Sequence, residues 1–358
     1  MKTSPDKKSL RRRLLHHVLP PALLFVLLLV FRSRTAWVDW YSLHFYPVWS
    51  GIASRISSWV PFSLDEVVIV AAIAGVVFCL FRLRRRWTTL VALLLWLLVW
   101  ASIGWELNYY RSDIFARAGK QAERFDPRRF QRFLDDYAQE LNGSYLPWND
   151  LDKDAVEQEV KQYYTALPAR WGLTQPKAWQ RPKKLMFKWV LNSFGVSGYV
   201  GMFASEIQIN NDAPNREYPF LFAHELSHLL GVSNEAEANY WAYSACTASA
   251  RPEIRYAGLQ SLLPYVLTNA KSALSEAEYE QFVEMLRPEV MEVYQAEKDH
   301  WLERYSPTVG RISGWFYDLY LRSHRIPSGK ANYNEVIRIL LTLSKPADLP
   351  PGEPSPQS

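Results

Sequence analysis

Two histidines and a glutamate near the middle of the chain have the spacing of a catalytic metal site. His224, Glu225 and His228 form an HExxH pattern. On a helix, residues four apart share a face, so both imidazoles can reach one ion. Glu225 follows the first histidine, where its carboxylate can take a proton from a metal-bound water. The pattern is typical of zinc-dependent hydrolases.

The flanking residues predict that this motif is helical. Pro219 suits a first helical turn, and Gly231 suits the position just after a helix end. Between them lie apolar residues that would bury the helix: Phe220, Leu221, Leu226, Leu229 and Leu230. A bare HExxH is expected by chance in roughly 1 in 100 chains of this length. The residues after the motif make chance a poorer explanation.

A catalytic zinc needs a third protein ligand and an open position for water. Glu235 and Glu237 both lie on a second helix that we expect to begin after Asn234. Asn234 suits the N-cap, and Glu237 then occupies the position that completes a capping box. Because capping accounts for Glu237, we predict Glu235 as the third ligand and Glu237 as the reserve ligand.

The second helix resembles part of the zincin peptidases. Glu235, Ala238 and Asn239 match an ExxAN pattern, and in those enzymes a glutamate ligand on an ExxAD or ExxAN helix follows HExxH. The resemblance implies that Asn239 braces a metal-bound histidine. Six residues separate His228 from Glu235, fewer than in the best-known glutamate-ligand peptidases. Asn234 stands where metzincins carry a third histidine, and its amide is a poor zinc ligand, so we adopt the glutamate interpretation.

Other reactive side chains receive no role from the sequence. His300, His324, Tyr199 and Tyr333 are candidates for stabilising a transition state, and we assign none of them. The two cysteines, Cys79 and Cys246, fall in different predicted environments, so no disulfide is expected.

Three apolar segments in the first third of the chain have the length of membrane helices. They cover residues 14–31, 64–81 and 87–105, and each is near the ~20 residues that a crossing needs. The first segment follows a basic tail, residues 1–13, and precedes arginines rather than a small-residue cleavage site. We therefore interpret it as a retained helix and not as a signal peptide.

Charge predicts the orientation of these helices. The basic tail and the arginine-rich turn 82–86 should be cytoplasmic by the positive-inside rule. Three crossings put both segments on the same side, so the loop 32–63 and everything after Trp105 would be extracytoplasmic. The loop is rich in aromatic residues, and we weigh two arrangements for it. One is a helix on the membrane surface over Tyr46–Trp59, and the other is a loop packed against the soluble domain.

Residues 106–343 are predicted to form one mainly helical α+β domain. Helical periodicity is expected over 126–142, 152–167, 252–268, 275–297, 311–324 and 333–343. The exception is a glycine-punctuated stretch, 193–211, which favours two short strands or a hairpin just before the HExxH helix. Residues 344–358, rich in proline and glycine, are predicted to be a disordered tail.

The whole chain resembles an uncharacterised bacterial family of domain-of-unknown-function proteins that have three N-terminal membrane helices and a zincin-like domain. The resemblance rests on Asn108–Arg111, Gly195–Gly201, the AHELSH…GVSNEAEAN run and Ile254–Gly258. It covers nearly the whole chain. It implies a metallopeptidase-like site without a known substrate.

These observations predict a membrane α-helical N-terminus followed by a zincin-like metallopeptidase domain with Zn²⁺ as cofactor. Expected partners are a peptide or protein substrate and the lipid bilayer of the cell membrane. Nucleic acid is not expected, because the net charge of +5 is concentrated at the membrane boundary. The sequence indicates neither the substrate nor the oligomeric state.

Two other interpretations remain open. The first is a catalytically silent zincin-like membrane sensor or binding module, against which the intact Glu225 argues. The second is a structural membrane protein whose HExxH is accidental, and metal content would distinguish it from the other two.

Overall fold

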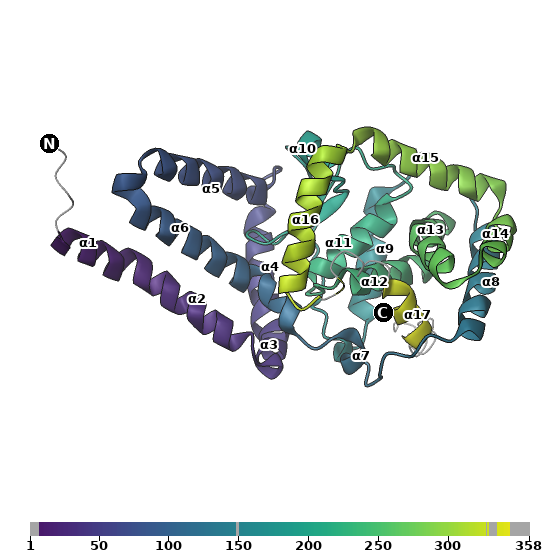
Figure 1. The fold of residues 1–358 in the computed structure, drawn as a ribbon. Coiled ribbons are helices and arrows are strands. Elements are labelled where there is room, and N and C mark those ends of the chain that lie inside the picture. The colour runs from purple at the N-terminus through teal and green to yellow at the C-terminus, as the bar shows by residue number, and fades with distance from the viewer. Residues whose placement is uncertain (1–6, 148–149, 327, 329–334, 344–358) are drawn as a thin grey trace, which may run out of the picture. The chain divides into compact units, whose positions relative to one another are not determined.

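The computed structural model describes residues 7–147, 150–326, 328 and 335–343. The chain is mainly helical, as the sequence predicts (Figure 1). It divides into two compact units. Unit 1 contains Met1–Ser112 and Gly201–Glu206, and unit 2 contains Asp113–Val200 and Ile207–Ser358. The predicted tail 344–358 lies outside the described residues.

Unit 1 carries the apolar helices. Its helical elements are α1 (Lys7–Arg13), η1 (Leu14–Val18), α2 (Leu19–Phe31), α3 (Thr35–Trp40), η2 (Tyr41–Phe45), α4 (Tyr46–Ser57), α5 (Leu64–Phe81), α6 (Leu83–Gly104) and η3 (Glu106–Tyr110). Three stretches are long and apolar enough to cross a membrane: Leu10–Phe31, Leu64–Phe81 and Arg86–Gly104. They coincide with the three segments predicted from the sequence. The stretch between the first two is helical from α3 to α4, so the predicted surface helix exists, and its place on a membrane stays a prediction.

A buried carboxylate fixes the start of α5. Glu206 accepts hydrogen bonds from the hydroxyls of Ser57 and Ser63 and from the backbone N–H groups of Leu64 and Asp65, the last two at 3.0 and 3.1 Å. The first N–H groups of a helix have no partner within the helix, and a negative charge near them is stabilising. Glu206 therefore supplies the charge and two of the hydrogen bonds that this helix end needs, while the N-cap Ser63 accepts the Glu66 N–H at 3.1 Å.

Asp65 holds the turn that precedes Glu206. Its carboxylate accepts the backbone N–H groups of Phe203 and Ala204, both at 2.9 Å. The backbone at Gly201 passes so close that a Cβ there would lie 2.0 Å from Asp65 Oδ2. Only glycine permits this approach.

The described strands form one small sheet. Its strands are β1 (Lys183–Lys184), β2 (Gly198–Gly201) and β3 (Glu206–Ile209), in the order β1-β3-β2. β2 and β3 follow each other directly and confirm the pair of strands predicted before the HExxH helix. β1 pairs with β3 in parallel, with Lys183 opposite Gln208, and was not predicted.

Helices make up most of unit 2. They are α7 (Ile114–Arg117), α8 (Pro127–Gly143), α9 (Lys153–Ala166), η4 (Ala169–Trp171), α10 (Lys188–Phe194), α11 (Tyr218–Leu229), α12 (Glu235–Thr247), α13 (Pro252–Ala273), α14 (Glu276–Met285), α15 (Pro288–Arg304), α16 (Pro307–Ser323) and α17 (Val336–Leu343). α12 packs against both α11 and α13. Phe222, Trp241 and Leu259, one from each of these helices, are buried.

One predicted helix of unit 2 is wrong. The expected single helix 275–297 is two helices, α14 and α15, interrupted at Leu286 and Arg287. Pro288 lacks an N–H and disfavours a helical backbone at the preceding residue, so it can begin α15 but cannot continue α14. The capping box predicted at Ser275, with Glu278 as its partner, is confirmed.

Replacing Glu206 with glutamine tests the cap of α5. Glu206→Gln keeps the size of the side chain but removes its charge. The new amide also directs its own N–H groups toward the N–H and O–H donors that the carboxylate accepts. We expect the unfolding free energy to fall by roughly 1–3 kcal/mol, measured as a lower unfolding midpoint of the full chain in nanodiscs. Glu276→Gln, at an exposed helix start, is the matched control. Equal midpoints for Glu206→Gln and wild type would contradict this account of the cap.

Candidate metal centre

α11 and α12 bring the three predicted ligands together. His224 Nε2 and His228 Nε2 lie 3.1 Å apart, and Glu235 Oε2 lies 3.3 Å from each of them. All three side chains are buried. Within the part of the chain that the structure describes, no other group of three His, Cys, Asp or Glu side chains has ligand atoms this close together.

The spacing and chemistry of these atoms fit a zinc ion. Ligand atoms around a tetrahedral zinc, each about 2.0–2.2 Å from the metal, lie about 3.3 Å from one another. Two imidazoles and one carboxylate are also a ligand set found at catalytic zinc, where the fourth position is left to water or substrate.

The turn after α11 fixes the orientation of His228. Gly231 has a φ of +101°, its N–H donates to the carbonyl of His228, and the N–H of Val232 donates to the carbonyl of Ser227. This pair of bonds is a Schellman motif, which requires glycine-like backbone freedom at its left-handed position. The motif places the Val232 carbonyl 2.7 Å from His228 Nδ1. That nitrogen therefore carries a proton, and Nε2 points toward Glu235.

The charges of His228 and Glu235 stabilise each other and shift the pKa values of both groups. Burial lowers the pKa of His228, but the negative charge of Glu235 outweighs it and raises this pKa to about 9. Burial raises the pKa of Glu235, but the charge of His228 and the hydrogen bonds from both histidines hold it well below its usual range. The carboxylate is thus ionised, as a metal ligand must be, and a bound cation would replace the proton shared with the imidazoles.

Glu225 lies beside the cluster, under strand β2. Its Oε2 is buried and has no hydrogen-bond partner among the described residues. A Cβ at Gly198 would lie 2.8 Å from its Oε1 and 3.0 Å from the Gln208 carbonyl oxygen, so a side chain there would have to displace the carboxylate. Burial raises the pKa of Glu225, although His224 and His228 oppose the rise. A raised pKa brings a carboxylate closer to the range useful for proton transfer.

The reserve ligand, Glu237, is engaged elsewhere. Its carboxylate forms an ion pair with Arg117 and accepts a hydrogen bond from Trp241 Nε1 at 3.0 Å. The side chain of Asn234 accepts the Glu237 N–H at 2.9 Å, which confirms the predicted N-cap. Among the described residues, the return bond of a capping box is not formed, because the carboxylate is turned toward Arg117. The structure places Glu237 outside the cluster.

The predicted brace by Asn239 is not formed. Asn239 is buried on α12, but its Nδ2 has no hydrogen-bond partner among the described residues, and neither has His224 Nδ1. The histidine that does receive support is His228, from the Val232 carbonyl. The sequence does not indicate this contact directly, although Gly231 signals the turn that produces it.

A tyrosine from α16 also reaches the cluster. Tyr317 donates its hydroxyl to Glu235 Oε1 at 2.7 Å. The candidates named from the sequence lie elsewhere: His300 and His324 hydrogen-bond to backbone carbonyls, Tyr199 is on β2, and Tyr333 lies outside the described residues. Since 82 residues separate Tyr317 from Glu235, no local pattern points to it.

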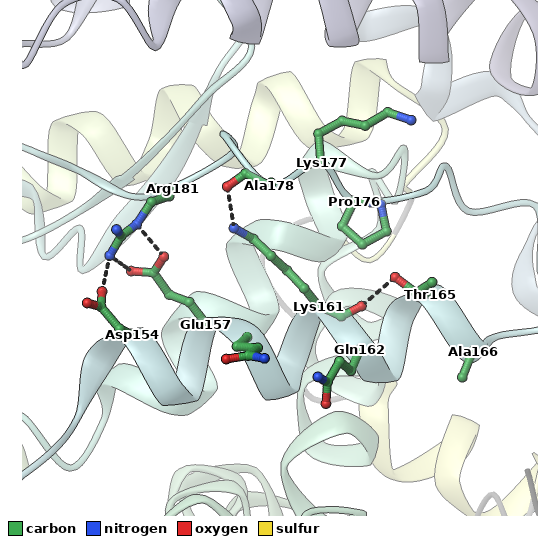
Figure 2. Close-up of a pocket in the computed structure, with 11 residues that line it drawn as sticks. Asp154, Glu157, Lys161, Gln162, Thr165, Ala166, Pro176, Lys177, Ala178 and Arg181 are labelled. Carbon is green, nitrogen blue, oxygen red and sulfur yellow. Dashed lines mark hydrogen bonds and ion pairs between the residues drawn. The ribbon is translucent and has the colours of Figure 1, made fainter. Parts of the chain in front are cut away.

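A separate hollow of about 660 Å³ lies between α9 and the segment 176–181 (Figure 2). Lys161 donates to the Ala178 carbonyl at 3.3 Å, and Arg181 pairs with Asp154 and Glu157. None of the residues that line this hollow belongs to the cluster of His224, His228 and Glu235.

The chain belongs to the family described as "Protein of unknown function (DUF3810)", whose profile matches residues 41–341. The match includes His224, His228 and Glu235 as well as Tyr317. It confirms the resemblance to a family of unknown function. No curated protein and no solved structure matches the chain.

Exchanging one carboxylate at a time distinguishes the two glutamates of α12. Glu235→Gln should greatly reduce the zinc content of the folded protein. Glu237→Gln leaves Arg117 buried without its counter-charge, so we expect it to lower the unfolding free energy by about 3–5 kcal/mol and to leave zinc per folded chain unchanged. Metal analysis of the folded, monodisperse fraction measures both effects. Loss of zinc from Glu237→Gln alone would transfer the ligand role to Glu237.

Two half-buried acids near the start of α11 predict a pH dependence of stability. Burial and the charge of Glu297 raise the pKa of Glu217 to about 8, and burial raises the pKa of Glu297 to about 7. Because both values exceed the value of about 4.3 for an unfolded chain, the folded protein binds more protons. Stability from these groups is therefore present at low pH and is lost as the pH rises toward 8.

Glu217→Gln removes one of these titrations. Relative to wild type, the variant should gain more at pH 8 than at pH 5, by about 1 kcal/mol or more, the equivalent of at least one pKa unit. Chemical unfolding at both pH values measures the difference, with the exposed Glu276→Gln as control. An equal gain at pH 5 and pH 8 would show that Glu217 does not titrate in this range.

Proposed function

We propose that the protein is a membrane-anchored, zinc-dependent peptidase whose catalytic residues lie in unit 2. The observation that carries the proposal is the buried group of His224, His228 and Glu235 with Glu225 beside it. A metal site that serves only structure needs no additional carboxylate at this position, whereas a hydrolase needs one to take a proton from water.

The residues have distinct roles in this proposal. His224, His228 and Glu235 would hold the ion. A bound zinc supplies a water whose pKa is lowered to about 7 and polarises the substrate carbonyl. Glu225 accepts the proton of the attacking water at Oε2 and later donates it to the leaving amine. Its confinement beneath Gly198 limits the positions that the carboxylate can take.

The sheet supports a peptide as substrate. β2 lies at one end of the strand order β1-β3-β2, and an extended peptide can add to the edge of a sheet through main-chain hydrogen bonds. A peptide paired with β2 would pass the residue that lies over Glu225, which is Gly198. This arrangement would bring a backbone carbonyl to the metal centre, as zincin-like peptidases require.

The charge pattern supports an orientation for the membrane helices. The basic residues of the N-terminal tail and of the turn 82–86 favour the cytoplasmic side. Three crossings would then place the residues after α6 outside the cytoplasm. The catalytic residues would act on extracytoplasmic peptides or proteins rather than within the bilayer, because the metal centre lies outside the three apolar helices.

Loss of activity without loss of zinc is the test of this function. The full chain in nanodiscs is loaded with zinc and assayed on a library of fluorogenic peptides and on an unfolded protein. Glu225→Gln should retain zinc and lose about 10²–10⁴-fold in cleavage rate, the usual contribution of a general base. Glu276→Gln is the matched control. Cleavage by Glu225→Gln at the wild-type rate, or no cleavage of any substrate by zinc-loaded wild type, would refute the proposal.

A further inference from the structure

The Glu235 carboxylate is held from two sides. Its Oε2 lies 3.3 Å from Nε2 of both histidines, His224 and His228. Its Oε1 accepts the hydroxyl of Tyr317 at 2.7 Å. The glutamate is only 6% exposed, and hydrogen bonds to an ionised, buried acceptor are stronger than neutral ones.

We propose that Tyr317 is a positioning residue of the metal centre and that it couples the docking of α16 to metal occupancy. This rests on the proposed function in one respect, namely that the cluster binds a divalent metal ion. A carboxylate can coordinate a cation through one oxygen or through both. With the Tyr317 hydroxyl on Oε1, Glu235 would offer a metal ion Oε2 alone and would leave a coordination position for water.

The position of α16 makes this hydrogen bond a link between the helix and the centre. α16 packs along α10, and Ser306 begins the helix, with its N–H donating to the Ser193 carbonyl at 3.3 Å. The side chains of Trp315 and Leu319 are 62% and 52% exposed, so one face of the helix is open. Tyr317 reaches inward to Glu235.

Thermodynamic linkage makes the coupling reciprocal. If the Tyr317 hydroxyl favours the metal-binding conformation of Glu235, then metal binding favours the docked position of α16 by the same factor. Zinc should therefore slow hydrogen exchange of the α16 amides as well as those of α11 and α12. Removing the hydroxyl should abolish the effect on α16 and leave the effect on α11.

The test uses the full chain in nanodiscs and zinc alone as the probe. Tyr317→Phe keeps the ring and removes the hydroxyl, and it should weaken zinc binding by about 10–100-fold, the usual effect of losing a partner of a metal ligand. Tyr305→Phe is the matched control, because the Tyr305 hydroxyl has no hydrogen bond in the described part of the chain. A merely structural role would lower the unfolding midpoint of the metal-free variant and leave zinc affinity unchanged.

Each possible result of these measurements either supports or overturns the proposal. Zinc affinity of Tyr317→Phe within about twofold of wild type, far below the expected effect, would overturn it. So would α16 exchange in wild type that does not respond to zinc, a measurement that needs no variant. If the wild-type protein binds no zinc, the proposed metal site and this inference are both wrong. If it binds zinc but cleaves no peptide, only the proposed activity is wrong, since zinc affinity and hydrogen exchange of α16 still test the role of Tyr317.

Discussion

The candidate metal centre depends on an ionised carboxylate buried between two imidazoles. A buried charge is strongly unfavourable unless it is paired and hydrogen-bonded. Glu235 meets this condition with His224 and His228 on one oxygen and Tyr317 on the other. Three helices, α11, α12 and α16, must therefore be in place together. A zinc ion would satisfy the same constraint with a larger positive charge, which explains why the arrangement suits a metal site.

The short connection between α11 and α12 is what brings Glu235 to the histidines. α11 ends in a Schellman motif at Gly231, and α12 begins at the N-cap Asn234. Two compact helix ends in direct succession reverse the chain within a few residues. The spacing from His228, shorter than in the best-known glutamate-ligand peptidases, thus follows from the turn and places the third carboxylate within reach.

Local signals predicted the parts of the site that depend on neighbours in the sequence. The HExxH helix, the N-cap at Asn234 and the choice of Glu235 for the cluster all follow from spacing and capping. Glu237 illustrates the limit of such signals, since its carboxylate pairs with Arg117, a partner 120 residues away. Tyr317 was missed for the same reason. Contacts between distant helices depend on tertiary packing, which periodicity does not encode.

In the fold as well, features that depend on local sequence were predictable, and features that depend on contacts between distant residues were not. The three apolar helices and the strands before α11 were predictable from composition and glycine punctuation, whereas β1 was not, because two residues carry too little pattern. The break before Pro288 was predictable in principle. The role of Glu206 in capping α5 was not predictable, because it depends on contacts with Ser57 and Ser63, which lie far away in the sequence.

We propose that His224, His228 and Glu235 hold one zinc ion, and zinc X-ray absorption of the full chain tests this most directly. We expect about one zinc per chain, with two imidazole nitrogens and at least one oxygen at about 2.0–2.2 Å. Folded protein without zinc, or a coordination shell without two imidazoles, would contradict it.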